Sequence, residues 1–85
     1  MDYCCEIVEN SEEGQTIAAI IRYDNGKLTS EATRGYENVL SSVMQQSMLN
    51  REEGVEISAA DDPEEWIQLL PENIYGTYLF ARLVV

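Results

Sequence analysis

The sequence predicts an α+β domain, in which an antiparallel sheet of about four to five strands carries one longer and one short helix on one face. Three observations lead to this prediction. Apolar residues alternate on both sides of an Asn25-Gly26 pair, as in a β-hairpin. They recur every three or four positions within 36–48, as on one side of a helix. An Asp62-Pro63 pair precedes a second apolar run, which is typical of a helix start.

The first two strands are predicted over residues 3–8 and 16–23, because both segments are rich in aromatic and β-branched residues. The segment 10–14 between them contains turn-forming residues and ends in glycine. Side chains alternate between the two faces of a strand. One face of the second strand should therefore carry Ile17, Ala19, Ile21 and Tyr23, and the other Ala18, Ile20 and Arg22.

The third strand is predicted over residues 27–31, antiparallel to the second. Asn25-Gly26 is the preferred pair for a two-residue type I′ turn, because both positions need a positive φ. The hairpin 16–31 is therefore the best-defined local prediction.

The longer helix is predicted from the apolar stripe within 36–48. Thr33 is the expected N-cap, and Gly54 is expected to close the segment.

Three elements are predicted in the last third of the chain. Residues 55–58 read as a short strand. The short helix should be capped by Asp62 and Glu65 and limited to about two turns by Pro71. The final strand, 77–85, is apolar on both faces and is predicted to lie in the centre of the sheet.

The chain, 1–85, is predicted to fold as one compact domain around one core, because a chain of this length supports a single domain. The predicted core residues are Ile17, Ile21, Val39, Leu40, Val43, Trp66, Leu70 and Phe80.

Acidity is the strongest functional signal in the sequence. The chain has 16 Asp and Glu residues, five Lys and Arg residues and no His, which gives a formal charge of −11. Most of the acids lie within 1–15 and 51–72. Such a charge favours a basic partner and disfavours direct contact with nucleic acid or an anionic membrane.

The residues that carry most catalysis and metal binding are missing. Without His, the usual general base and a common zinc ligand are absent. Cys4 and Cys5 have no basic neighbour to activate them, and they are interpreted as strand residues in a reducing compartment. The carboxylates within 61–65 lack the spacing of a calcium loop and are interpreted as helix-capping residues. We therefore expect neither enzymatic activity nor a metal or cofactor.

Within these two acidic segments, the acids of 9–13 and of 52–65 are predicted to converge into one field that binds a basic protein. The expected binding residues are Glu9, Glu12, Glu13, Glu52, Glu53, Asp61, Asp62 and Glu64.

A second contact surface is predicted on the longer helix. Residues 38–50 contain no charge, although 25% of the chain is charged. Protein interfaces are depleted in charged residues. The uncharged outer face could bind the partner or a second copy in a homodimer, and it comprises Ser41, Ser42, Gln45 and Gln46.

The leading functional hypothesis is a cytoplasmic, non-enzymatic protein that inhibits a basic nucleic-acid-handling protein by mimicking nucleic acid. A phage counter-defence inhibitor and an immunity protein or antitoxin both fit the pattern. The alternative is an acidic adaptor that self-associates through the uncharged helix 38–50. A third class is a small calcium-dependent binder. The non-functional interpretation is that the acidity only keeps the protein in solution.

Overall fold

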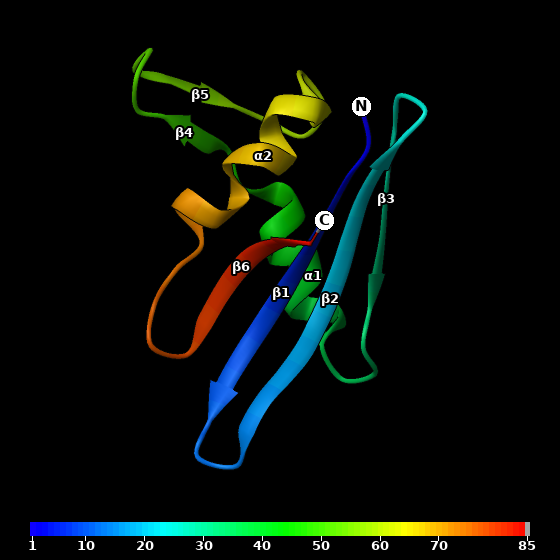
Figure 1. The fold of residues 1–85 in the computed structure, drawn as a ribbon, viewed down its shortest axis with the longest axis vertical. Helices are drawn as coiled ribbons and strands as arrows, with labels where there is room; N and C mark the ends of the chain where they lie inside the picture. Colours follow the sequence, from blue (N-terminus) through cyan, green and yellow to red (C-terminus); the bar gives the residue numbers. More distant parts are fainter. Residues whose placement is uncertain (85) are drawn as a thin grey trace.

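A computed structural model describes residues 1–84. The prediction of an α+β fold is confirmed: a four-stranded antiparallel sheet carries two helices on one face, beside a small two-stranded sheet (Figure 1). The elements follow the order β1 (Tyr3–Ser11), β2 (Gly14–Asp24), β3 (Lys27–Ala32), α1 (Glu37–Gln45), β4 (Met48–Asn50), β5 (Val55–Ile57), α2 (Pro63–Asn73) and β6 (Leu79–Val84).

The predicted hairpin is present. β2 and β3 pair antiparallel with Asp24 opposite Lys27, and the turn residues Asn25 and Gly26 have φ values of 50° and 79°. These positive φ values are those that a type I′ turn requires.

A β-bulge in β2 changes which residues face the helices. Ile7 pairs with Ala19 whereas Val8 pairs with Ile17, so Ala18 has no opposite residue on β1. Ala18 and Ala19 are both buried in the core beneath the helices. Because the extra residue shifts the alternation by one, Ile17 and Ile21 cannot share a face, as a regular strand would require.

The predicted core is therefore confirmed only in part. Ile21, Val43, Trp66 and Leu70 are buried in one cluster, and Val39 and Leu40 pack against it while remaining half-buried. The prediction was wrong for Ile17 and Phe80, which are absent from this cluster and pair with Val8 on the opposite face of the sheet.

The first helix is shorter than predicted. It begins after Tyr36 and has no side-chain N-cap, because the Thr33 hydroxyl donates instead to the Ile17 carbonyl oxygen at 2.6 Å. The helix ends at Gln45, and the buried Met48 belongs to β4. Met48 fits the helical spacing of apolar residues in the sequence, but it reaches the same core from a strand.

The second helix is longer than predicted. The Asp62 carboxylate accepts from the Glu65 backbone N–H at 3.1 Å, which confirms the predicted cap. Pro71, however, lies inside the helix, which continues to Asn73. A proline in a helix costs about 3 kcal/mol. Burial of the preceding Leu70, whose carbonyl oxygen accepts from Ile74 N–H at 2.8 Å, offsets this cost.

Removing the Asp62 cap should destabilise the fold measurably. We expect Asp62→Ala to cost about 1 kcal/mol, because the Glu65 N–H loses its acceptor at the helix start. Asp61→Ala is the matched control, since it removes the same charge one residue earlier. Urea unfolding followed by circular dichroism measures both variants, and equal midpoints for the two would contradict a capping role.

The last strand is not central. The strand order is β3-β2-β1-β6, so β1 and β2 are the central strands and β6 pairs with β1 alone. The apolar residues on both faces of β6 have another origin: Ala81 packs into the core under the helices, whereas Phe80 faces away from them. The predicted strand reached Val85, which lies outside the described residues.

Candidate functional site

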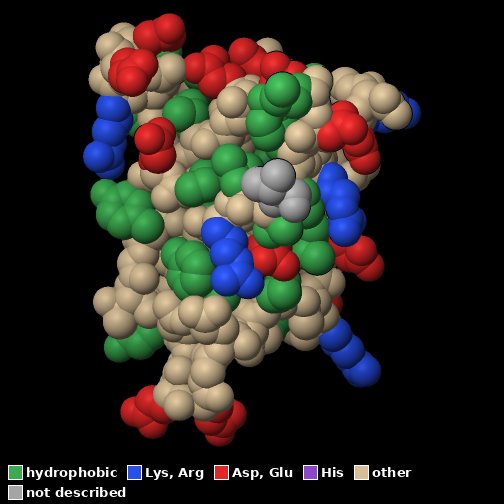
Figure 2. Space-filling model, viewed as in Figure 1, with side chains coloured by type: hydrophobic (Ala, Val, Ile, Leu, Met, Phe, Trp, Pro, Cys, Tyr) green, Lys and Arg blue, Asp and Glu red, His purple; other side chains and the backbone are tan. Residues whose placement is uncertain are grey.

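Acidic side chains gather at one end of the molecule's longest axis, here called the acidic end (Figure 2). Four segments meet there: the β4–β5 hairpin, the start of α2, the N-terminus and the β2–β3 turn (Figure 1). Their acidic residues are Asp2, Asp24, Glu52, Glu53, Glu56, Asp61, Asp62, Glu64 and Glu65.

Few of these carboxylates are neutralised. Among residues 1–84 the one ion pair joins Arg82 Nε to Glu6 Oε1 at 2.8 Å, on the sheet rather than at the acidic end. Glu52, Glu53 and Asp61 are exposed to solvent. A cluster of exposed, unpaired carboxylates projects a negative field that attracts basic surfaces.

Two acids of this end interact directly. The pKa of Asp24 is raised because its carboxyl group shares a hydrogen bond with Asp2 and is repelled by the charge of Asp2. The structure therefore adds Asp2 and Asp24 to the acidic end, which the sequence alone did not indicate because the two lie 22 positions apart in the chain.

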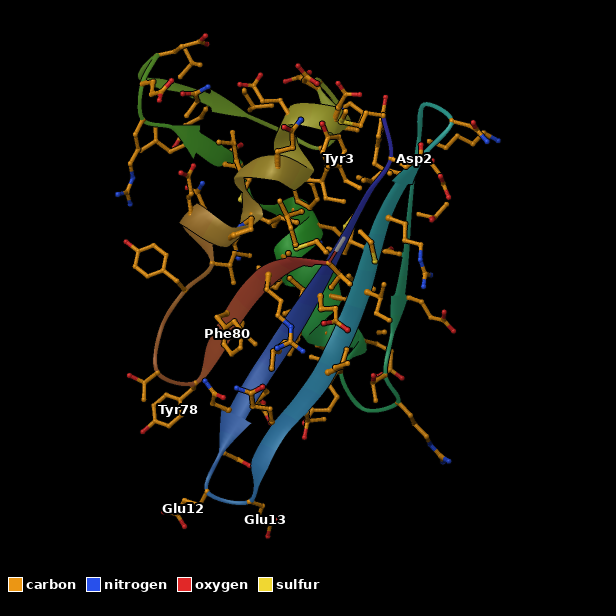
Figure 3. The ribbon with its side chains drawn as sticks, in the orientation of Figure 1. Asp2, Tyr3, Glu12, Glu13, Tyr78 and Phe80 are labelled. Carbon is orange, nitrogen blue, oxygen red and sulfur yellow. The ribbon has the colours of Figure 1, made fainter. Side chains whose placement is uncertain are left out.

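The predicted convergence of both acidic segments is wrong. Glu12 and Glu13 lie at the tip of the β1–β2 hairpin, at the opposite end of the longest axis from the acidic end (Figure 3). The molecule extends 37 Å along that axis, and the long hairpin carries its tip away from the helices. Glu9 is also unavailable, because its half-buried carboxylate accepts from the Tyr36 hydroxyl at 2.8 Å.

Asn50 organises the acidic end, a role that the sequence analysis missed. Its side-chain oxygen accepts from the backbone N–H groups of Glu52 and Glu53 at 3.1 and 3.2 Å. Its amide nitrogen donates to Glu65 Oε1 at 2.7 Å. Asn50 thus fixes the hairpin tip and ties it to α2. An Asn placed directly before a turn is the signal that indicates such a role, because its side chain can bond to the backbone two residues on.

A second asparagine anchors the hairpin from the other end of α2. Asn73 accepts from the Leu49 N–H at 3.0 Å and donates to the Leu49 carbonyl oxygen at 3.2 Å. The acidic hairpin is therefore held against α2 through two residues of β4, Leu49 and Asn50, which keeps its carboxylates in a defined place.

The uncharged outer face of α1 is open to solvent, as its predicted role requires. Ser41, Ser42, Gln45 and Gln46 are all exposed, so no other part of residues 1–84 covers them. This face adjoins a shallow hollow whose floor is partly apolar, lined by Asn38, Val39, Ser42, Val43, Gln46 and Leu79.

One of the two cysteine thiols is held inside the core. Cys5 is buried, and burial raises the pKa of its thiol to about 12. Such a thiol stays protonated and unreactive. In residues 1–84 no three Cys, Asp or Glu side chains come together as a metal site would require.

No helix in the described part of the chain has the length and apolar character to cross a membrane. Comparisons with protein-family models, curated proteins and solved structures found no match to this chain.

Proposed function

We propose that the protein is a non-enzymatic binding protein that captures a basic, nucleic-acid-handling protein through its acidic end. By occupying the surface that otherwise holds nucleic acid, it inhibits that partner. The observation that carries the proposal is the gathering of acidic side chains at the acidic end (Figure 2), where the four segments contain nine Asp and Glu residues against two basic ones, Lys27 and Arg51.

The geometry of the acidic end supports mimicry of a polyanion. Duplex DNA presents one charge per about 1.7 Å of its axis, and proteins that bind it carry arrays of basic side chains. The acidic end presents its carboxylates on an end of the molecule whose short axes span 26 and 24 Å. Asn50 holds the backbone of Glu52 and Glu53 in place, so this loop loses less conformational freedom when a partner binds.

The uncharged face of α1 complements this end. It continues along the chain directly into β4 and the acidic hairpin. Desolvating Ser and Gln costs less than desolvating carboxylates, so this face can be buried while the acidic end supplies steering.

Affinity capture from a lysate of the source tests the proposal. We expect the immobilised protein to retain a basic nucleic-acid-binding protein that is released by raised salt and by added duplex DNA, because both act on the same charges. Retention of a partner that neither salt nor DNA releases would contradict the proposed mechanism.

A second candidate is the acidic adaptor that self-associates through the uncharged helix face. The hollow between α1 and Leu79 favours it, since a two-fold contact needs one self-complementary patch. The double variant Ser42→Glu, Gln45→Glu should abolish such an assembly by burying unpaired charge. Light scattering that shows the parent mass for this variant would contradict a contact there.

A further inference from the structure

One face of the four-stranded sheet has no helix over it. Both helices pack on the other face, where Trp66, Ile67 and Leu70 meet Cys5 and Ile7 in the core (Figure 1). The uncovered side, here called the helix-free face, is turned toward the viewer in Figure 2.

The strand register gives the composition of the helix-free face. Three rows cross it, each centred on a residue of β1: Cys4, Glu6 or Val8. The apolar members of these rows are Cys4, Val8, Ile17, Ile20, Phe80 and Val84.

These positions are apolar where an exposed sheet is usually polar. Ile17 and Val84 are 37% and 42% exposed, whereas Val8 is 0% exposed because other side chains of this chain already cover it. Antiparallel sheets with one wet face alternate apolar inward and polar outward residues, whereas strands that are apolar on both faces are typical of sheets covered on both sides. Within residues 1–84, helices cover one face of the sheet only.

The charges on the helix-free face are balanced. Two acids, Glu6 and Glu31, accompany two bases, Arg22 and Arg82. Glu6 and Arg82 form the 2.8 Å ion pair near the middle, and the Arg82 side chain is 47% exposed. The molecule's excess of negative charge therefore lies elsewhere, at its two ends.

We propose that a second copy of this chain packs on the helix-free face, sheet against sheet, as a symmetric dimer. A copy that itself carries a charge of −11 can approach closely only where the surface is neutral, and this face meets that condition. A two-fold axis through the middle of the face brings the Arg82 of each copy toward the Glu6 of the other. Stacked sheets about 10 Å apart are a standard way to bury two apolar faces.

The size of the face sets the strength of the dimer. Four strands about 4.8 Å apart and roughly six residues long cover about 400 Å² per copy. Two copies would then bury about 800 Å² in total, which is below the roughly 1,000 Å² expected of a stable interface, so we expect a weak, reversible dimer that forms only at high micromolar or higher concentrations.

Salt should strengthen the dimer. The acidic ends of two copies repel each other, and ions screen that repulsion while leaving apolar burial intact. Binding of a basic partner by the acidic end should weaken under the same conditions, so the two interactions are distinguishable.

Sedimentation velocity across a concentration series, at low and high NaCl, tests the proposal. We expect the mass to rise with concentration from the 9.6 kDa of one chain to twice that value, at lower concentrations in high salt. Ile17→Lys should raise the protein concentration at which half of the chains are dimeric by at least about tenfold, because it places an unpaired charge in the contact. Leu49→Lys is the matched control, since Leu49 is a strand residue of nearly equal exposure, 36%, outside this face.

The native thiol Cys4 provides a second measurement that needs no substitution in the face. Cys4 is half-buried on the helix-free face, while Cys5 is buried in the core and protonated. Labelling of Cys4 by a small thiol reagent should slow as protein concentration rises through the dimer midpoint.

Three results would overturn the proposal. The first is a single-chain mass at every concentration and salt level. The second is a dimer that Leu49→Lys or the Ser42→Glu, Gln45→Glu variant dissociates while Ile17→Lys does not. The third is a Cys4 labelling rate that does not depend on protein concentration.

Discussion

Replacing Trp66 with alanine is expected to lower the free energy of unfolding by about 3–5 kcal/mol, a large share of the domain's stability at 25 °C. Trp66 is 0% exposed, and its indole Nε1–H donates to the Gln46 carbonyl oxygen at 2.9 Å. It is the largest buried side chain and joins α2 to the end of α1. Truncating a buried Trp to Ala costs about 3–5 kcal/mol. At roughly 0.05–0.15 kcal/mol per residue, the whole domain is stable by only about 4–13 kcal/mol.

Urea unfolding followed by far-ultraviolet circular dichroism measures this effect. Trp66→Phe keeps most of the apolar volume but leaves the Gln46 carbonyl without its donor, and we expect it to cost about 1–3 kcal/mol. Tyr78→Ala is the control for aromatic loss at a side chain that is 76% exposed, with an expected change within about 0.5 kcal/mol. Equal midpoints for Trp66→Ala and Tyr78→Ala would refute the assignment of Trp66 to the centre of the core.

Reversing the charge of Glu52 and Glu53 to Lys is expected to weaken binding of the basic partner at least about tenfold, because like charges that face each other cost several kcal/mol. The fold should survive, since both side chains are exposed at a hairpin tip and Asn50 bonds to their backbone rather than to their carboxylates. Calorimetric titration with the captured partner measures the affinity.

The molecule contains a matched control for this experiment. Glu12 and Glu13 form an identical pair at another hairpin tip, at the far end of the longest axis (Figure 3). Reversing them to Lys changes the net charge by the same amount, but we expect less than a threefold loss of affinity at physiological salt, because screening acts within about 8 Å. Equal losses for the two pairs would show that only net charge matters.

The elements set by local chemistry were predictable from sequence. Asn25-Gly26 needs no distant residue to turn the chain, and Asp62 finds its acceptor role within three residues. The elements set by distant contacts were not. Ala18 can be recognised as the extra residue of a bulge only once β2 is paired with β1. The position of β6 at the edge of the sheet likewise depends on which strand it pairs with.

The same distinction between local and distant contacts applies to the candidate site. The sequence identified the acids of 52–65 but could not tell that Glu12 and Glu13 point away from them, because the length and direction of a hairpin in space follow from the packed sheet. The contributions of Asp2 and Asp24 needed the strand pairing for the same reason. The helix-free face was present in the sequence as strands apolar on both sides, but only the structure shows that one side lacks a cover.

The central claim is that the acidic end occupies the nucleic-acid site of a basic partner, and displacement of DNA tests it most directly. Fluorescence anisotropy of a labelled duplex bound to the captured partner reports release of the duplex. We predict that the parent protein and the Glu12→Lys, Glu13→Lys variant displace the duplex at similar concentrations, while Glu52→Lys, Glu53→Lys needs at least about ten times more. If the duplex stays bound at saturating parent protein, or if both variants displace it equally well, the acidic end is not a nucleic-acid mimic.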